Sequence, residues 1–114
     1  MIFNLPYPPS TNNLFVNVPG RGRVTSKAYA SWKKAAALSL MAQRVKPILG
    51  PVEVSLIIEE KNLRSDLDNH SKSAIDALVA AGIIETDRAK CLRKLTLEWG
   101  DVHGARVEVL ERAR

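Results

Sequence analysis

Residues 52–82 read VEVSLIIEEKNLRSDLDNHSKSAIDALVAAG, and two different spacings of apolar residues follow one another in this stretch. Over residues 52–59 apolar and polar side chains alternate, which predicts a half-buried β-strand. Residues 61–65 form a polar loop. From about Leu67 to Ala81 apolar residues recur at helical spacing, and Gly82 is typical of the position just after a helix. The stretch therefore predicts a strand, a loop and a helix in succession.

Similar patterns on both sides of this stretch predict the remaining elements. A helix is expected from Thr25 or Ser26 to about Val45, before a breaker region with Pro47 and Pro51. Further strands are expected at residues 1–5, 14–18, 95–99 and 107–109. The Gly100–Gly104 segment favours a hairpin between the last two strands. We predict an α+β fold, a small mixed sheet with two main helices, in a single domain over residues 1–114.

Composition excludes several classes of protein. The chain has 114 residues, of which 46% are hydrophobic and 25% charged, so it is an ordinary globular sequence and not a disordered one. Because no apolar run approaches the ~18–20 residues that span a bilayer, we expect no membrane segment. We also expect no secretory signal, and the single cysteine, Cys91, suits a reducing cytoplasm.

The charges are strongly segregated along the chain. Residues 1–52 contain seven Lys or Arg and no acid, whereas all 12 acids lie from Glu53 onward beside ten bases. A positive field of this kind favours a polyanion as the binding partner, with nucleic acid the leading candidate. Lysines that merely keep the protein soluble would give the same net charge. The candidate DNA-binding residues are Arg21, Arg23, Lys27, Lys33 and Lys34.

The segment between the third strand and the second helix carries two carboxylates, Asp66 and Asp68. At 100° per residue Asp68 and Lys72 fall on the stripe that continues into the apolar helix face, and Asp66 can converge with Asp68 if the helix begins after Asp66. Two converging carboxylates repel each other, and Mg²⁺ removes that conflict because it binds one or two carboxylates together with phosphate oxygens. Asp87, beyond the helix, is a plausible third acid.

A structural interpretation of the same residues stays open. Asp66 or Ser65 can be a helix N-cap worth about 1 kcal/mol, and Asp68 with Lys72 can be an exposed pair worth ~0.3–0.5 kcal/mol. Asp-x-Asp is a short pattern that many unrelated proteins contain. Spacing alone therefore leaves both a metal site and a surface role possible.

Four segments, taken together, resemble the RusA family of Holliday-junction resolvases. They are residues 5–13 (LPYPPSTNN), residues 64–69 (RSDLDN), Lys72 with residues 75–78 (IDAL) and Gly82, and Asp87 at the family's spacing. The resemblance implies a Mg²⁺-dependent endodeoxyribonuclease that acts on branched DNA as an intertwined homodimer. It places the catalytic, metal-binding acids at Asp66, Asp68 and Asp87, and the catalytic lysine at Lys72.

Two details qualify this resemblance. Thr86 stands where some relatives carry a second acid, but Asp87 remains, so we expect activity. A helix from Leu67 to Ala81 is about 22 Å long, so Asp87 follows its far end. Asp87 must then either double back along the helix or serve a site shared across the dimer. Asn69 and Asp76 are candidates for orienting Asp68 and Lys72.

Three functions remain to be distinguished. The first is a magnesium-dependent nuclease that resolves four-way junctions by paired cuts. The second is a non-catalytic DNA-binding or scaffolding module of the same fold, and the third is a metal enzyme on a smaller phosphorylated substrate. The basic first half argues against the third, because a small ligand needs no such field. A bacterial cytoplasm, with the gene from the cell or a prophage, is the expected setting.

Overall fold

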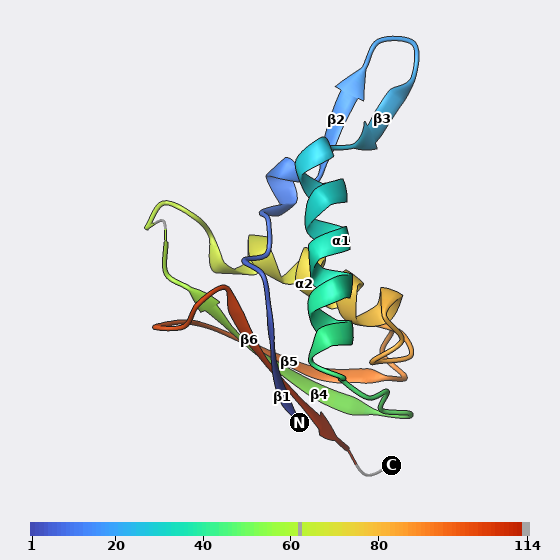
Figure 1. The fold of residues 1–114 in the computed structure, drawn as a ribbon, viewed down its shortest axis with the longest axis vertical. Helices are drawn as coiled ribbons and strands as arrows, with labels where there is room; N and C mark the ends of the chain where they lie inside the picture. The colour runs from blue at the N-terminus through green and yellow to red at the C-terminus, as the bar shows by residue number, and fades with distance from the viewer. Residues whose placement is uncertain (62, 113–114) are drawn as a thin grey trace.

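The computed structural model describes residues 1–61 and 63–112, and its strands form two sheets (Figure 1). The larger sheet has the order β1-β6-β4-β5, and its strands are β1 (Ile2–Leu5), β4 (Val52–Glu59), β5 (Leu92–Gly100) and β6 (Ala105–Glu111). The smaller sheet is a hairpin of β2 (Phe15–Val18) and β3 (Gly22–Thr25). The helices are α1 (Lys27–Ala42) and α2 (Ser71–Ala80), with short 3-10 helices η1 (Thr11–Asn13) and η2 (Leu67–His70).

The larger sheet is mixed, because β4 pairs in parallel with β5 and antiparallel with β6. Alternate residues of β4 are buried, and their side chains form one core with buried residues of α1 and α2. That burial confirms the predicted alternation and the predicted α+β fold. The hairpin of β2 and β3 projects from the end of α1, away from the larger sheet (Figure 1).

The predicted hairpin between the last two strands is wrong. β4 lies between β5 and β6, so the two strands each pair with β4. The connection instead crosses the end of β4, where the Gly104 amide donates to Glu59 Oε1 at 2.7 Å and the Glu59 amide donates to the Gly104 carbonyl at 2.9 Å. Alternation in a sequence shows which face of a strand is buried but not which strand lies next to it. Strand β3 is also absent from the predicted strands.

Both helices begin where the sequence predicts, but the first turn of the second helical segment has a different geometry. Ser26 caps α1 by accepting a hydrogen bond from the Tyr29 amide at 3.1 Å. The second helical segment does begin after Asp66, but its first turn is the tighter η2. A 3-10 turn advances each residue by about 120° rather than 100°, so the predicted stripe is rotated. The buried face of α2 carries Ser73, Ala74, Ile75 and Leu78, and Lys72 is exposed.

Gly82 ends the second helix as predicted. Its φ of 74° lies in the left-handed region, which glycine adopts without a Cβ clash. The Gly82 amide donates to the Val79 carbonyl and the Ile83 amide to the Leu78 carbonyl, which is the Schellman pattern. Within the part of the chain that the structure describes, no helix is both long and apolar enough to cross a membrane.

Candidate functional site

Asp66 and Asp68 lie near the ends of β4 and β5 where both strands finish. β4 and β5 are parallel, with Ile58 opposite Trp99. Two residues after Asp68, the His70 ring makes an edge contact with the Trp99 ring at a centroid distance of 5.8 Å. The acidic segment is therefore held at the carboxyl end of this parallel pair. In open α/β sheets, ligands commonly bind at that end of parallel strands.

Neither carboxylate is buried, and Asp66 does not act as a side-chain cap. Asp66 has an extended backbone, with φ −88° and ψ 131°, and stands at the N-cap position of η2 without a side-chain capping hydrogen bond. The capping interpretation therefore does not describe Asp66. Asp68 is in the first turn of η2, and its partner in the alternative interpretation, Lys72, pairs with a different acid.

Lys72 forms an ion pair with Asp76 one turn further along α2. The distance from Lys72 Nζ to Asp76 Oδ2 is 3.2 Å, and the two side chains are 55% and 38% exposed. Asp76 thus contacts the candidate catalytic lysine and is itself an acid on the surface of α2. Because the pair is exposed, it holds the ammonium only weakly, and the ammonium can turn to another anion.

Asp87 lies at the other end of the sheet. It belongs to the segment between α2 and β5, and this segment stays against residues 48–52. There the Ile48 amide donates to the Ile83 carbonyl at 2.8 Å, and the Gly50 amide to Glu85 Oε1 at 3.4 Å. β5 starts at Leu92, opposite Val52, and runs for nine residues, so its two ends are about 26 Å apart. The chain does not double back along the helix.

The described residues of one chain consequently contain no group of three or more His, Cys, Asp or Glu side chains placed to hold a metal ion. Asp66 and Asp68 still suit Mg²⁺, which takes one or two carboxylates and completes its shell with water and phosphate oxygens. The third acid, Asp87, does not reach them within the chain. Asn69 is half-buried, and its backbone amide donates to the Asp66 carbonyl at 3.2 Å.

The basic candidates begin next to the acidic segment. The Thr11 hydroxyl, just before the β2–β3 hairpin, donates to the Asn69 carbonyl at 2.9 Å. The hairpin leads away from this point with Arg21 at its turn and Arg23 on β3, both exposed. The Arg23 guanidinium stacks over the Phe15 ring at 4.4 Å, which keeps the charge on the hairpin surface. Lys27 and Lys34 lie on α1 and are not buried.

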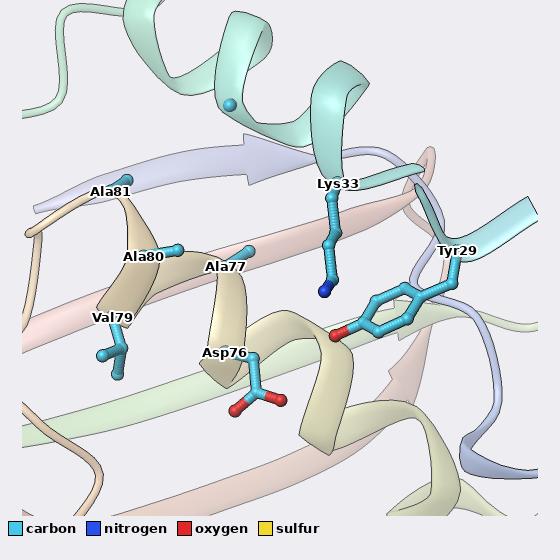
Figure 2. Close-up of a pocket in the computed structure, with 8 residues that line it drawn as sticks. Tyr29, Lys33, Asp76, Ala77, Val79, Ala80 and Ala81 are labelled. Carbon is cyan, nitrogen blue, oxygen red and sulfur yellow. The ribbon is translucent and has the colours of Figure 1, made fainter. Parts of the chain in front are cut away.

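Lys33 faces a groove between the two helices rather than open solvent alone. The groove has a volume of about 430 Å³, and Lys33 lies beside Tyr29 and across from Asp76 (Figure 2). Lys33 Nζ stands 4.4 Å from the centroid of the Tyr29 ring. Burial, and then the negative charge of Asp76, raise the pKa of the Tyr29 hydroxyl above its ordinary value of 10.0. This groove brings the basic face of α1 close to the Lys72–Asp76 pair.

Comparison with known families identifies the chain. The model of the family described as endodeoxyribonuclease RusA matches residues 6–110, nearly the whole sequence. The chain belongs to the RusA family. Membership in this family implies a nuclease of the kind that resolves Holliday junctions. A search of curated proteins finds no match to this chain.

His70 is the residue near the site whose contacts the sequence pattern did not reveal. It is only 2% exposed. Its ring lies between Tyr7 and Trp99, with a centroid distance of 5.2 Å to Tyr7. Tyr7 and Trp99 are only partly buried and pack against the core. A single sequence contains no signal that these three distant rings meet.

Proposed function

We propose that this RusA-family protein is a Mg²⁺-dependent endonuclease that resolves four-way DNA junctions by paired strand cuts in a homodimer. The observation that carries the proposal is the placement of Asp66 and Asp68. They lie unburied at the carboxyl ends of β4 and β5, and the basic β2–β3 hairpin starts beside them. The acids for a metal thus lie at the base of a hairpin that carries bases for a phosphate backbone, although the two groups come from opposite halves of the sequence.

Asp66 and Asp68 would hold Mg²⁺, together with Asp87 from a second protomer. When bound, the ion supplies an activated water and neutralises charge on the scissile phosphate. Lys72 would bind a phosphate oxygen as a point charge, releasing Asp76 as it does so. Asn69 would orient the acidic segment, and Asp76 would hold Lys72 until a phosphate displaces it. The arginines of the hairpin, with Lys27, Lys33 and Lys34, would hold the DNA backbone.

The edge of the larger sheet supports a shared site. β5 is an edge strand of nine residues, and Leu95 on it is 39% exposed. A long edge strand with unpaired backbone groups and an exposed apolar side chain is a natural place for a second chain to pair. If two copies of β5 pair antiparallel about a two-fold axis, the start of one strand lies beside the end of the other. Asp87 of the second protomer then approaches the Asp66–Asp68 segment of the first.

A two-fold dimer also suits the substrate. A four-way junction has two-fold symmetry, and its resolution needs two matched cuts, which two equivalent sites supply. The proposed protein is a single RusA-like domain over residues 1–114 that acts in a bacterial cytoplasm, encoded by the cell or a prophage. The buried thiol of Cys91, which forms no disulfide, suits that reducing compartment.

One observation favours a second candidate, a DNA-binding module of the same fold without turnover. No three-acid group is assembled within the described residues of one chain, and a monomer would therefore bind DNA without a complete metal site. The two candidates differ in what they do to a bound junction.

The test is cleavage of a synthetic four-way junction with and without Mg²⁺ by the wild type and Asp68→Asn. The nuclease cuts two opposite strands only with Mg²⁺, and Asp68→Asn binds the junction but cuts at least about 100-fold more slowly. Asp101→Asn, an exposed acid in the β5–β6 connection, is the matched control and should cut normally. Wild-type binding without cutting would support the module, and neither binding nor cutting would contradict both.

A further inference from the structure

The first turn of the acidic segment is fastened to the proline-rich stretch near the N-terminus. This stretch, residues 6–11, has the sequence PYPPST. Three hydrogen bonds join it to the second helical segment: His70 Nδ1 to the Pro8 carbonyl at 2.8 Å, the Ser73 hydroxyl to the Pro9 carbonyl at 3.0 Å, and the Thr11 hydroxyl to the Asn69 carbonyl at 2.9 Å. The His70 bond is made by a side chain only two residues after the candidate metal ligand Asp68.

The geometry of the His70 bond fixes which ring nitrogen carries the proton. The Pro8 carbonyl oxygen can only accept a hydrogen bond, so Nδ1 must be the donor. A neutral imidazole then has a lone pair on Nε2, and this buried atom has no hydrogen-bonding partner among the described residues. Since the ring is 2% exposed and lies between two aromatic rings, it has little freedom to rotate.

Among the described residues, no hydrogen bond or ion pair anchors the carboxylates themselves in this way. Asp66 is extended and Asp68 belongs to a single 3-10 turn, so no long helix fixes their direction. Two hydrogen bonds hold their backbone. The backbone amide of Asn69 donates to the Asp66 carbonyl, and the Ser71 hydroxyl donates to the Asp68 carbonyl at 2.8 Å. Both of these bonds stay within the segment. The contacts that tie the segment to the proline-rich stretch are those of Asn69 and His70.

We propose that His70 is a positioning residue for the metal-binding acids, acting through its Nδ1–H bond to the Pro8 carbonyl. The ring couples the proline-rich stretch, the acidic turn and the end of β5, and so fixes the direction in which Asp66 and Asp68 present their carboxylates. This inference rests on the proposed function, because it assumes that these two acids bind Mg²⁺. Groups that orient ligands from outside the coordination shell commonly change metal affinity by about 10–100-fold.

The test is a Mg²⁺ titration followed by the NMR signals of the Asp66 and Asp68 amides, in parallel with junction cleavage. Asparagine carries its NH₂ group the same number of bonds from the backbone as Nδ1, so His70→Asn keeps the donor. His70→Leu removes it, and His70→Gln displaces it by one bond. We expect His70→Leu to raise the Mg²⁺ concentration at half-maximal shift by about tenfold, and His70→Asn to restore most of the loss.

Ser73→Ala is the matched control, because it removes a hydrogen bond from the same proline-rich stretch to α2 without touching the acidic turn. It should lower the melting temperature but leave the Mg²⁺ midpoint within about twofold. If His70→Leu does not fold, the comparison of His70→Asn with His70→Gln gives the same answer, with the larger change expected for Gln. Nitrogen-15 spectra of the wild type should show the proton on Nδ1.

Three results overturn the inference. Equal Mg²⁺ midpoints for the wild type and His70→Leu, with only the melting temperature changed, would reduce His70 to a structural role while the proposed nuclease stands. A proton on Nε2 alone would contradict the hydrogen bond on which the inference depends. A wild type whose Asp66 and Asp68 signals do not respond to Mg²⁺ would remove the proposed magnesium site, and the positioning role with it.

Discussion

Lys72 Nζ lies 3.2 Å from Asp76 Oδ2, one turn along α2, and both side chains are solvent-exposed. An exposed pair at this spacing contributes only about 0.3–0.5 kcal/mol to stability. Asp76 therefore engages the lysine charge one turn further from the acidic segment, without holding it firmly. A phosphate that approaches Lys72 competes with one weakly bound carboxylate. This competition should have a measurable effect on the affinity for DNA.

Asp76→Asn should strengthen junction binding. The substitution removes the anion that competes with phosphate for Lys72, and we expect the dissociation constant to fall by about twofold, which corresponds to roughly 0.4 kcal/mol. The free energy of unfolding should fall by no more than about 0.5 kcal/mol. Electrophoretic mobility shift without Mg²⁺ measures the first and denaturant unfolding the second. Weaker binding by Asp76→Asn would show that the carboxylate holds Lys72 in its active position.

Lys72→Ala should reduce the cleavage rate of bound junction by about 100-fold, because it removes a cation from the developing charge on phosphate. Its stability should stay close to that of the wild type, since Lys72 is exposed on the surface of α2. Single-turnover cleavage with saturating protein separates this loss from binding. Lys46→Ala, an exposed lysine beyond the end of α1, is the control and should cut at the wild-type rate. A Lys72→Ala protein that cuts normally would remove this residue from the site.

The β2–β3 hairpin should contribute to the salt dependence of binding. The slope of log affinity against log salt concentration decreases by about 0.9 for every phosphate that the protein no longer neutralises, so the double variant Arg21→Ala and Arg23→Ala should reduce it by up to about 1.8. Lys46→Ala, beyond the opposite end of α1, is the matched control and should keep the slope. Fluorescence anisotropy over a range of salt concentrations makes the measurement. Equal slopes for all these proteins would place the DNA elsewhere.

Alkaline pH should destabilise the protein through Tyr29. Its pKa in the folded protein is raised above 10.0 by burial and by the charge of Asp76, so the unfolded chain loses the proton first as pH rises. The stability that this group contributes is therefore complete below about pH 10 and is lost as pH increases through the folded pKa. Asp76→Asn should lower that pKa, as ultraviolet titration of tyrosinate can show. An unchanged titration would mean that burial alone sets the pKa.

Much of the fold follows from local patterns. The alternation of Val52, Val54, Leu56 and Ile58 predicted a strand with one buried face, and all four residues are buried. Ser26 and Gly82 marked a helix start and a helix end through their capping chemistry. These features depend on neighbours in the sequence, and a single chain is enough to predict them.

Long-range features were harder to predict. Local patterns do not indicate that β4 separates β5 from β6, since pairing depends on the packing of the whole sheet. The 3-10 turn changed the angle between Asp68 and the residues of α2, because a helical wheel assumes one constant angle. The acids Asp66 and Asp68 were recognised from their spacing and the family resemblance. The position of Asp87 required the three-dimensional course of β5.

The most direct test of a site shared between protomers is complementation between two inactive variants, Asp66→Asn and Asp87→Asn. If Asp87 of one protomer completes the site of the other, a mixed dimer holds one site with both changes and one fully intact site. Unfolding and refolding the two proteins together should then restore Mg²⁺-dependent nicking of a four-way junction, to at most half of the wild-type activity per dimer. No recovery from a mixture that demonstrably forms mixed dimers, beside an active wild type, would contradict the shared site.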